Sequence, residues 1–179
     1  MKRLFLISGV LLLVPLFSAA EIEKIARPCE KGICLAWWPK LESAKGWHQE
    51  SDSSFANGVN IQVPDGYTFS DAETVIYAKA SYKPRIPKTT SLEMFIKDDK
   101  GEFLASDPST SIVEVQPLKT ADGKLLKSYT FFPKENGNWE RVSYGEEGDF
   151  YLIFTISSRS HSGFLKSLPV YGQYIGQYK

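Results

Sequence analysis

Alternating apolar and polar positions predict β-strands along much of the chain, and the clearest pair lies near its carboxyl end. Residues 139–144 alternate apolar and polar residues, residues 145–149 are glycines and acidic side chains typical of a turn, and residues 150–156 are almost all β-branched or aromatic. Both alternating faces of segment 150–156 are apolar. We therefore expect this segment to lie inside a sheet that is covered on both sides.

Four further segments show strand patterns, each followed by a proline or a turn signal: 59–63, 75–80, 112–115 and 127–132. Segment 59–63 alternates Val and Ile with Asn60 and Gln62, which predicts a half-buried strand. Residues 64–66 and 120–123 predict turns, and Asn136 with Gly137 is a strong hairpin signal. Together, residues 112–157 predict an antiparallel meander.

Helical spacing of apolar residues appears in two places. One helix is expected to begin near Thr90, because Thr90 and Glu93 have capping-box spacing. The second lies near the carboxyl end, where apolar residues recur every three or four positions from Phe164 onward. Pro169 suits the first turn of a helix, so this region predicts one helix ending at Ser167 and another starting at Leu168. The predicted fold class is α+β, an antiparallel sheet with helices packed against it as an α/β sandwich.

The amino-terminal residues have the pattern of a secretory signal peptide. Lys2 and Arg3 precede an apolar run over 4–17, and small residues follow at 18–20. An uncleaved amino-terminal anchor is the alternative. Cleavage after Ala20 predicts a periplasmic or secreted protein, divided into a signal peptide at 1–20, an amino-terminal segment at 21–54 and an α+β domain at 55–179.

Charge and hydropathy argue against two classes of partner. The whole chain has 21 basic and 21 acidic side chains, and removal of the signal peptide leaves a slight acidic excess without any clustered basic stretch. This argues against a nucleic-acid partner. After residue 20 no segment has the length and apolarity of a membrane span, so none is expected after cleavage.

Cys29 and Cys34 are the two cysteines of the chain. In an oxidising compartment two thiols this close predict a disulfide. A redox pair is less favoured because such motifs separate their cysteines by two residues. A zinc site would need further ligands, and the chain has only two histidines, so no metal and no cofactor are expected.

Aromatic and titratable residues supply the candidate binding positions: Trp38, Trp47, His48, Tyr144 and Glu146. Two adjacent Trp rings on an extended segment, Trp37 and Trp38, point to opposite sides, so one is expected to be buried and the other exposed. His48 follows Trp47 in a polar stretch, and it is also explained as a surface histidine.

Three segments resemble the PsbP-like fold group, which includes the DcrB-like envelope proteins of bacteria: GVNIQVPDGYTF, DFYLIFTISSRS and FLKSLPVYGQYIGQY. The resemblance covers residues 55–179 and carries no catalytic motif. It implies a noncatalytic protein that binds a partner or assists assembly.

The favoured hypothesis is a noncatalytic exported protein that binds an envelope protein or a small ligand. The alternative is an envelope hydrolase that uses His48 or His161 as base, with Glu146, Glu147 or Asp149 of the acidic turn as partners. A third hypothesis is an inhibitor that presents the loop between Cys29 and Cys34 to a partner.

Overall fold

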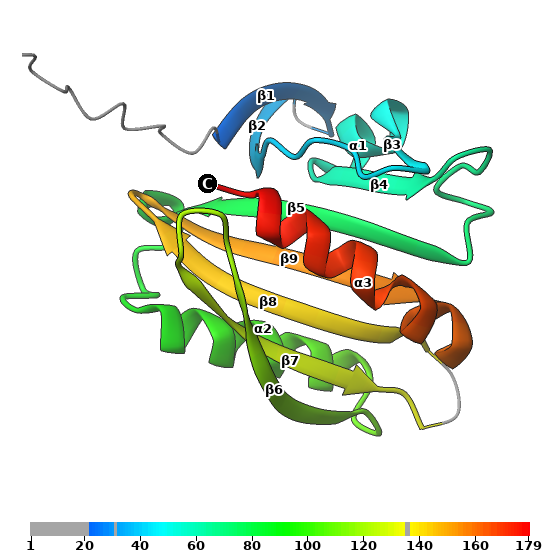
Figure 1. The fold of residues 1–179 in the computed structure, drawn as a ribbon. Helices are drawn as coiled ribbons and strands as arrows, with labels where there is room; N and C mark the ends of the chain where they lie inside the picture. Colours follow the sequence, from blue (N-terminus) through cyan, green and yellow to red (C-terminus); the bar gives the residue numbers. More distant parts are fainter. Residues whose placement is uncertain (1–21, 31, 135–136) are drawn as a thin grey trace, which may run out of the picture.

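The computed structural model describes residues 22–30, 32–134 and 137–179, and in these ranges nine strands form one antiparallel sheet (Figure 1). The strands are β1 (Ile22–Cys29), β2 (Gly32–Pro39), β3 (Trp47–Gln49), β4 (Asn60–Pro64), β5 (Thr74–Tyr82), β6 (Ser111–Lys119), β7 (Leu125–Phe132), β8 (Trp139–Glu147) and β9 (Phe150–Ser158). The helices are α1 (Ser51–Asn57), the 3-10 turn η1 (Lys83–Arg85), α2 (Leu92–Ser106) and α3 (His161–Gln177). This arrangement confirms the predicted α+β class.

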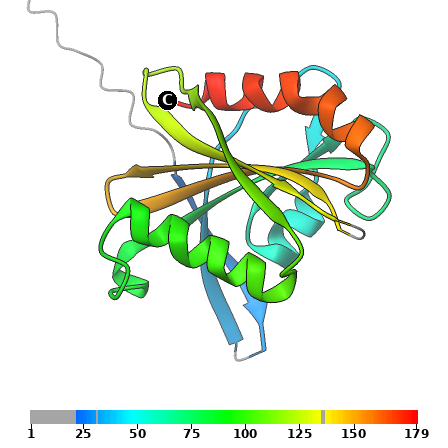
Figure 2. The ribbon, with the colours of Figure 1, turned by 90° about the horizontal axis from the view of Figure 1, so that it is seen from below.

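The sheet runs in the order β1-β2-β5-β9-β8-β7-β6, while β4 pairs with β5 and β3 pairs with β4. Strands β6 to β9 follow one another in space, which confirms the predicted meander. Helix α3 lies on one face of the sheet, whereas α2 and α1 lie on the other (Figure 2). The expected signal peptide, residues 1–20, and Asn136 of the expected hairpin lie outside the described residues.

Strand β9 is the centre of the sheet and is covered on both faces, as its two apolar faces predict. It pairs along its whole length with β5 and with β8, and every residue after Phe150 is buried. Toward α3 its neighbours include Phe164, Tyr171 and Ile175, which pack around Phe154. Toward α2, Ile153 packs with Phe131, Val142, Tyr144 and Ile96.

The predicted turn at 145–149 is too long, because β8 continues to Glu147 and only Gly148 and Asp149 connect the strands. Gly148 provides the turn with a φ of 50°. Gly145 instead serves packing, since a Cβ at that position would lie 2.5 Å from Leu126 Cδ2. The sequence pattern placed Gly145 in the turn, whereas in the structure this glycine allows the Leu126 side chain to approach the backbone of β8.

The expected break at Pro169 is wrong, because α3 is a single helix with Pro169 inside it. Proline removes one helical hydrogen bond and bends the helix, and the two parts of α3 are tilted relative to each other (Figure 2). Packing on both sides of the proline holds the helix together. Phe164 is buried before it, and after it the hydroxyl oxygen of Tyr171 lies 2.8 Å from the carbonyl oxygen of Phe154.

Helix α2 was predicted correctly, but its capping residue was not. Ser91, not Thr90, caps the helix, since its hydroxyl accepts a hydrogen bond from the Met94 amide at 3.2 Å. Glu93 pairs with Lys127 on β7 at 2.6 Å instead of completing a capping box. The helix continues through Gly101 to Ser106.

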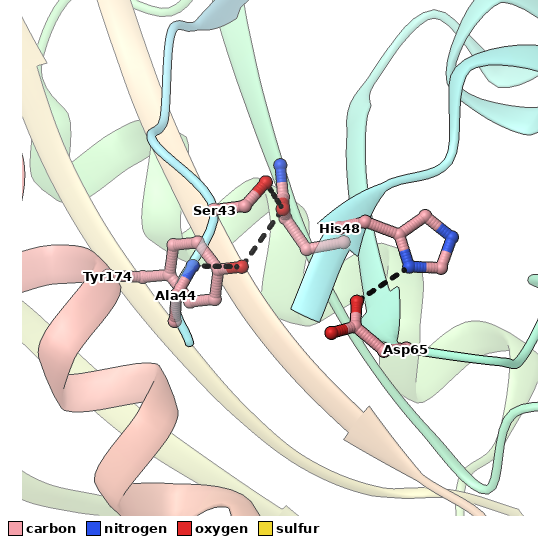
Figure 3. A network of polar contacts seen from close by, with 6 residues as sticks. Ser43, Ala44, His48, Asp65 and Tyr174 are labelled. Carbon is pink, nitrogen blue, oxygen red and sulfur yellow. Dashed lines mark hydrogen bonds and ion pairs between the residues drawn. The ribbon is translucent and has the colours of Figure 1, made fainter. Parts of the chain in front are cut away.

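Strand β4 is buried from Asn60 to Val63 and not half-buried, because its polar side chains have partners inside the protein. Gln62 donates to Asn60 Oδ1 at 2.8 Å, and Gln62 Oε1 accepts from the Tyr174 hydroxyl at 2.9 Å. Ser43 donates to the same amide oxygen, and Tyr174 in turn accepts from the Ala44 amide (Figure 3). This network joins α3 to the segment between β2 and β3.

The predicted disulfide is confirmed between Cys29 and Cys34, at the tip of the β1–β2 hairpin. The strands β1 and β3 and the helix α1 lie in a region for which no regular structure was predicted beyond an extended segment at 35–39. Within the described ranges, none of the helices combines the length and the apolar character that a membrane crossing requires.

The central position of β9 gives a stability prediction. We expect Leu152→Ala to lower the free energy of unfolding by about 2–5 kcal/mol, because Leu152 is 2% exposed and its truncation leaves a cavity. The matched control is Leu125→Ala on β7, where the side chain is 64% exposed and the loss should stay within about 0.5 kcal/mol. Urea denaturation of both variants measures the difference, and equal losses would contradict a buried β9.

Candidate functional site

The sequence-predicted binding residues do not form one site. Trp38 is 1% exposed, and its Nε1 donates to Glu23 at 2.9 Å, so its ring has no surface left for a ligand. Tyr144 is fully buried and donates to Asp99 Oδ2 at 2.7 Å. Glu146 is exposed and pairs with Lys83 at 3.2 Å. These residues therefore have structural partners and do not converge.

Trp47 and His48 are the two candidates that remain neighbours, on β3. His48 Nδ1 lies 3.2 Å from Asp65 Oδ1, and both side chains are exposed (Figure 3). The ring of Trp47 contacts that of Tyr174 edge to face, with 6.5 Å between centroids. His48 and Asp65 thus form a surface contact between β3 and the turn after β4. Trp47 and His48 line no described cavity together with the other candidate residues.

The parts of the alternative hydrolase are also separated. His48 pairs in register with Val63, toward the Thr74 end of β5, and the ring of His161 lies 4.1 Å from that of Trp139 at the same end of the sheet. The acidic turn lies at the opposite end of β8 and β9. Eight residues of strand separate the two ends, which is roughly 25 Å. Neither histidine can act with the acidic turn at this distance.

A cleft on the α2 face of the sheet is the candidate functional site. It consists of two adjoining cavities, of about 490 Å³ and about 390 Å³, that share Val59, Tyr77 and Glu140 in their linings. The first opens beside α1 and the loop before β5, and the second reaches α2 at Asp99 and Phe103. Both helices lie on this face of the sheet (Figure 2).

The floor of the cleft consists of rows of side chains across β5, β9 and β8. Val75, Ser157 and Glu140 are opposite one another in the strand register and form the first row. The next row, two residues along each strand, is Tyr77, Thr155 and Val142. Because side chains alternate between the faces of a sheet, all of them point to the α2 side.

Glu140 is the acidic group of the first row and is 9% exposed. Its Oε1 accepts a hydrogen bond from the Ser157 hydroxyl at 2.6 Å, and Ser157 Oγ accepts from the Asn138 amide at 2.9 Å. Burial raises the pKa of Glu140, and the negative charge of Asp99 raises it further, against the lowering effect of Ser157.

Ionisation of Asp99 and of Tyr77 is also unfavourable in the cleft. Burial raises the pKa of Asp99, although the Tyr144 hydrogen bond and the Lys79 charge lower it. The pKa of Tyr77 lies far above its usual value because of burial and the nearby charge of Glu140. The centre of the cleft therefore favours neutral side chains over charged ones.

Catalysis and metal binding would each require particular groups in the cleft. The hydroxyl of Ser157 is the one that contacts Glu140, but the pKa of that carboxyl is raised, which does not suit a base that activates a nucleophile. Neither His48 nor His161 lines the cleft. Among the residues that the structure describes, no group of three or more His, Cys, Asp or Glu side chains is placed to hold a metal ion. The cleft combines apolar walls with a few buried polar groups, as small-molecule sites do.

Sequence reasoning missed Glu140, although a signal was present. In the alternation of 139–144, Glu140 shares a face with Val142 and Tyr144, which is the inward face. A charged residue in the inward phase of a strand departs from the binary pattern and marks a candidate functional position. Asp99 had no such signal, because it lies within a run of charged residues on α2.

Comparison of the chain with models of known protein families finds no match, and comparison with curated proteins finds none either. The resemblance to the PsbP-like group therefore stays a prediction.

The buried carboxyl gives a prediction for stability against pH. In the folded protein the pKa of the Glu140 carboxyl is above its ordinary value of 4.5, so the unfolded chain loses this proton first as the pH rises. The free energy of unfolding therefore falls as the pH rises from the ordinary pKa through the pKa in the folded protein. Glu140→Gln cannot ionise. It should therefore stabilise the protein at pH 8, and the gain should shrink below the ordinary pKa.

Thermal unfolding of both proteins between pH 4 and pH 8 measures this gain. Glu42→Gln, at an exposed position, is the control and should give no comparable gain. A Glu140→Gln variant that is less stable than the parent at pH 8 would show that the ionised carboxylate is stabilised by its surroundings.

Proposed function

We propose that this protein is a noncatalytic exported protein that binds a small amphipathic ligand in the cleft between α1 and α2. The observation that supports this most is the composition of the first cavity. One side is apolar and comes from β4 and the residue before it, from β5 and from the loop before β5: Val59, Ile61, Phe69, Ala72 and Val75. The other side is polar and comes from β8, β9 and their flanking residues: Asn138, Glu140, Ser157 and Arg159.

The size and shape of the cleft favour a small molecule over a folded partner. A cavity of about 490 Å³ is in the range of known ligand sites, which is about 300–1,000 Å³. A stable protein interface needs about 800 Å² on each partner, and such surfaces are broad. The concave site, its apolar wall and its buried carboxyl suit a ligand with a hydrocarbon part and one polar end.

Two features support an exported address. The amino-terminal pattern at 1–20 is that of a signal peptide. The Cys29–Cys34 disulfide is typical of proteins that fold in an oxidising compartment. The noncatalytic role implied by the PsbP-like resemblance agrees with a binding function for the cleft.

Occlusion of the cleft tests the binding function. N-phenyl-1-naphthylamine, an apolar dye that fluoresces in apolar surroundings, should bind the mature protein with saturable fluorescence. Val75→Trp places an indole in the first row of the floor and should weaken dye binding at least about tenfold, or about 1.4 kcal/mol. Val113→Trp, at a 47% exposed position on β6, is the matched control and should bind the dye like the parent.

Circular dichroism of both tryptophan variants checks that they fold. Equal dye binding by Val75→Trp and the parent would place the dye elsewhere on the protein and refute the cleft as the binding site.

Export has its own test. When the full sequence is expressed in a Gram-negative host, the protein should appear in the periplasmic fraction with the mass of a chain that begins at Glu21. Intact-protein mass spectrometry measures the amino terminus, and recovery of the full-length chain with Met1 from the cytoplasm would contradict export.

A further inference from the structure

We infer that the ligand of the cleft is an amphipathic organic cation, such as an alkylamine, whose charged nitrogen pairs with Glu140. This inference rests on the proposed binding function and adds the chemical class of the ligand. It depends on the position of Glu140, on the other charges around the cleft, and on the nature of the opposite wall.

Among the residues that the structure describes, Glu140 is a buried acid without a cationic partner. Its hydrogen bond comes from Ser157, a neutral donor, and no ion pair to it occurs within the described ranges. The described ion pairs involve carboxylates that are more exposed, such as Glu93 and Glu146. A buried carboxylate without a cation is costly, and a cation supplied by a ligand removes that cost.

The charges around Glu140 favour a cation over an anion. The cleft lining contains three further acids, Glu73, Asp99 and Glu102, and two bases, Lys79 and Arg159. Arg159 already donates to the carbonyl oxygen of Ser70. Lys79 lowers the pKa of Asp99, which shows that its charge acts on that carboxyl. An anionic ligand would meet the carboxyl of Glu140 in this cleft, and among the described residues neither Arg159 nor Lys79 forms an ion pair with Glu140.

The surroundings of Glu140 also suit the rest of such a ligand. Tyr77 lines both cavities, as Glu140 does, and an aromatic ring attracts an ammonium group at its face. Val59, Ile61 and Val75 belong to the same cavity and offer an apolar wall to a hydrocarbon chain. A ligand with an amine at one end and an alkyl chain at the other would contact both sides.

Three probes of equal chain length test the inference: octylamine, octan-1-ol and octanoate. Isothermal titration calorimetry at pH 8 with the mature chain should give at least about tenfold tighter binding for octylamine than for octan-1-ol, with octanoate the weakest. Glu140→Gln should reduce octylamine affinity to that of octan-1-ol and leave octan-1-ol binding unchanged. Glu42→Gln, exposed and outside the cleft, should bind all three probes like the parent.

The outcomes separate this inference from the function on which it rests. Equal binding of octan-1-ol and octylamine, or octylamine binding that survives Glu140→Gln, would overturn the cationic ligand but keep an amphiphile site. Stronger binding of octanoate would also overturn it and would assign the polar end to Arg159 or Lys79. No binding of any probe, together with no dye binding, would refute the proposed function itself.

Discussion

The burial of β9 on both faces is the constraint on which the rest of the structure depends. A strand whose two faces are apolar needs a packed layer on each side. Helix α3 supplies one layer, with Phe164, Tyr171 and Ile175 in its core. Helix α2 supplies only part of the other layer, because it crosses the sheet diagonally.

The diagonal course of α2 follows from its ring contacts and explains why a cleft exists. Near its start, Phe95 stacks on Tyr151 of β9, with 4.8 Å between the ring centroids. Near its end, Phe103 contacts Phe131 of β7 at 4.7 Å, two strands away from β9. Helix α2 therefore does not cover the far end of β9 and β5, and the first row of the cleft floor, with Glu140, lies there beside α1.

Much of the fold could be predicted from the sequence, because period-two alternation and turn residues are local signals. The meander was predicted in this way. Helix α2 was predicted from capping-box spacing and apolar residues at helical spacing, and the disulfide from two closely spaced cysteines. The errors arose where tertiary contacts decide. Gly145 is a glycine because Leu126 packs against it, and α3 continues through Pro169 because its buried residues lie on both sides. No local pattern reports such contacts.

The candidate site was less predictable than the fold, because the residues that line it come from separate parts of the chain. Glu140 and Val75 are opposite Ser157 only through the pairing of β8 and β5 with β9. The sequence offered aromatic residues as candidates, but aromatic side chains fill cores as readily as they bind ligands. Trp38 and Tyr144 are examples, since both are fully buried.

Asp99 and Glu140, two acids of the cleft whose pKa values are raised, differ in how the protein compensates them, and this difference supports the proposal that Glu140 meets a ligand. Asp99 receives a hydrogen bond from Tyr144 and the favourable charge of Lys79. Glu140 receives one hydrogen bond from Ser157, and the nearby charge of Asp99 opposes its ionisation. A residue that served packing alone at this position would be better apolar, as Val142 is in the next row. A buried acid whose hydrogen bond comes from one neutral donor supports the proposal that its partner comes from outside the chain.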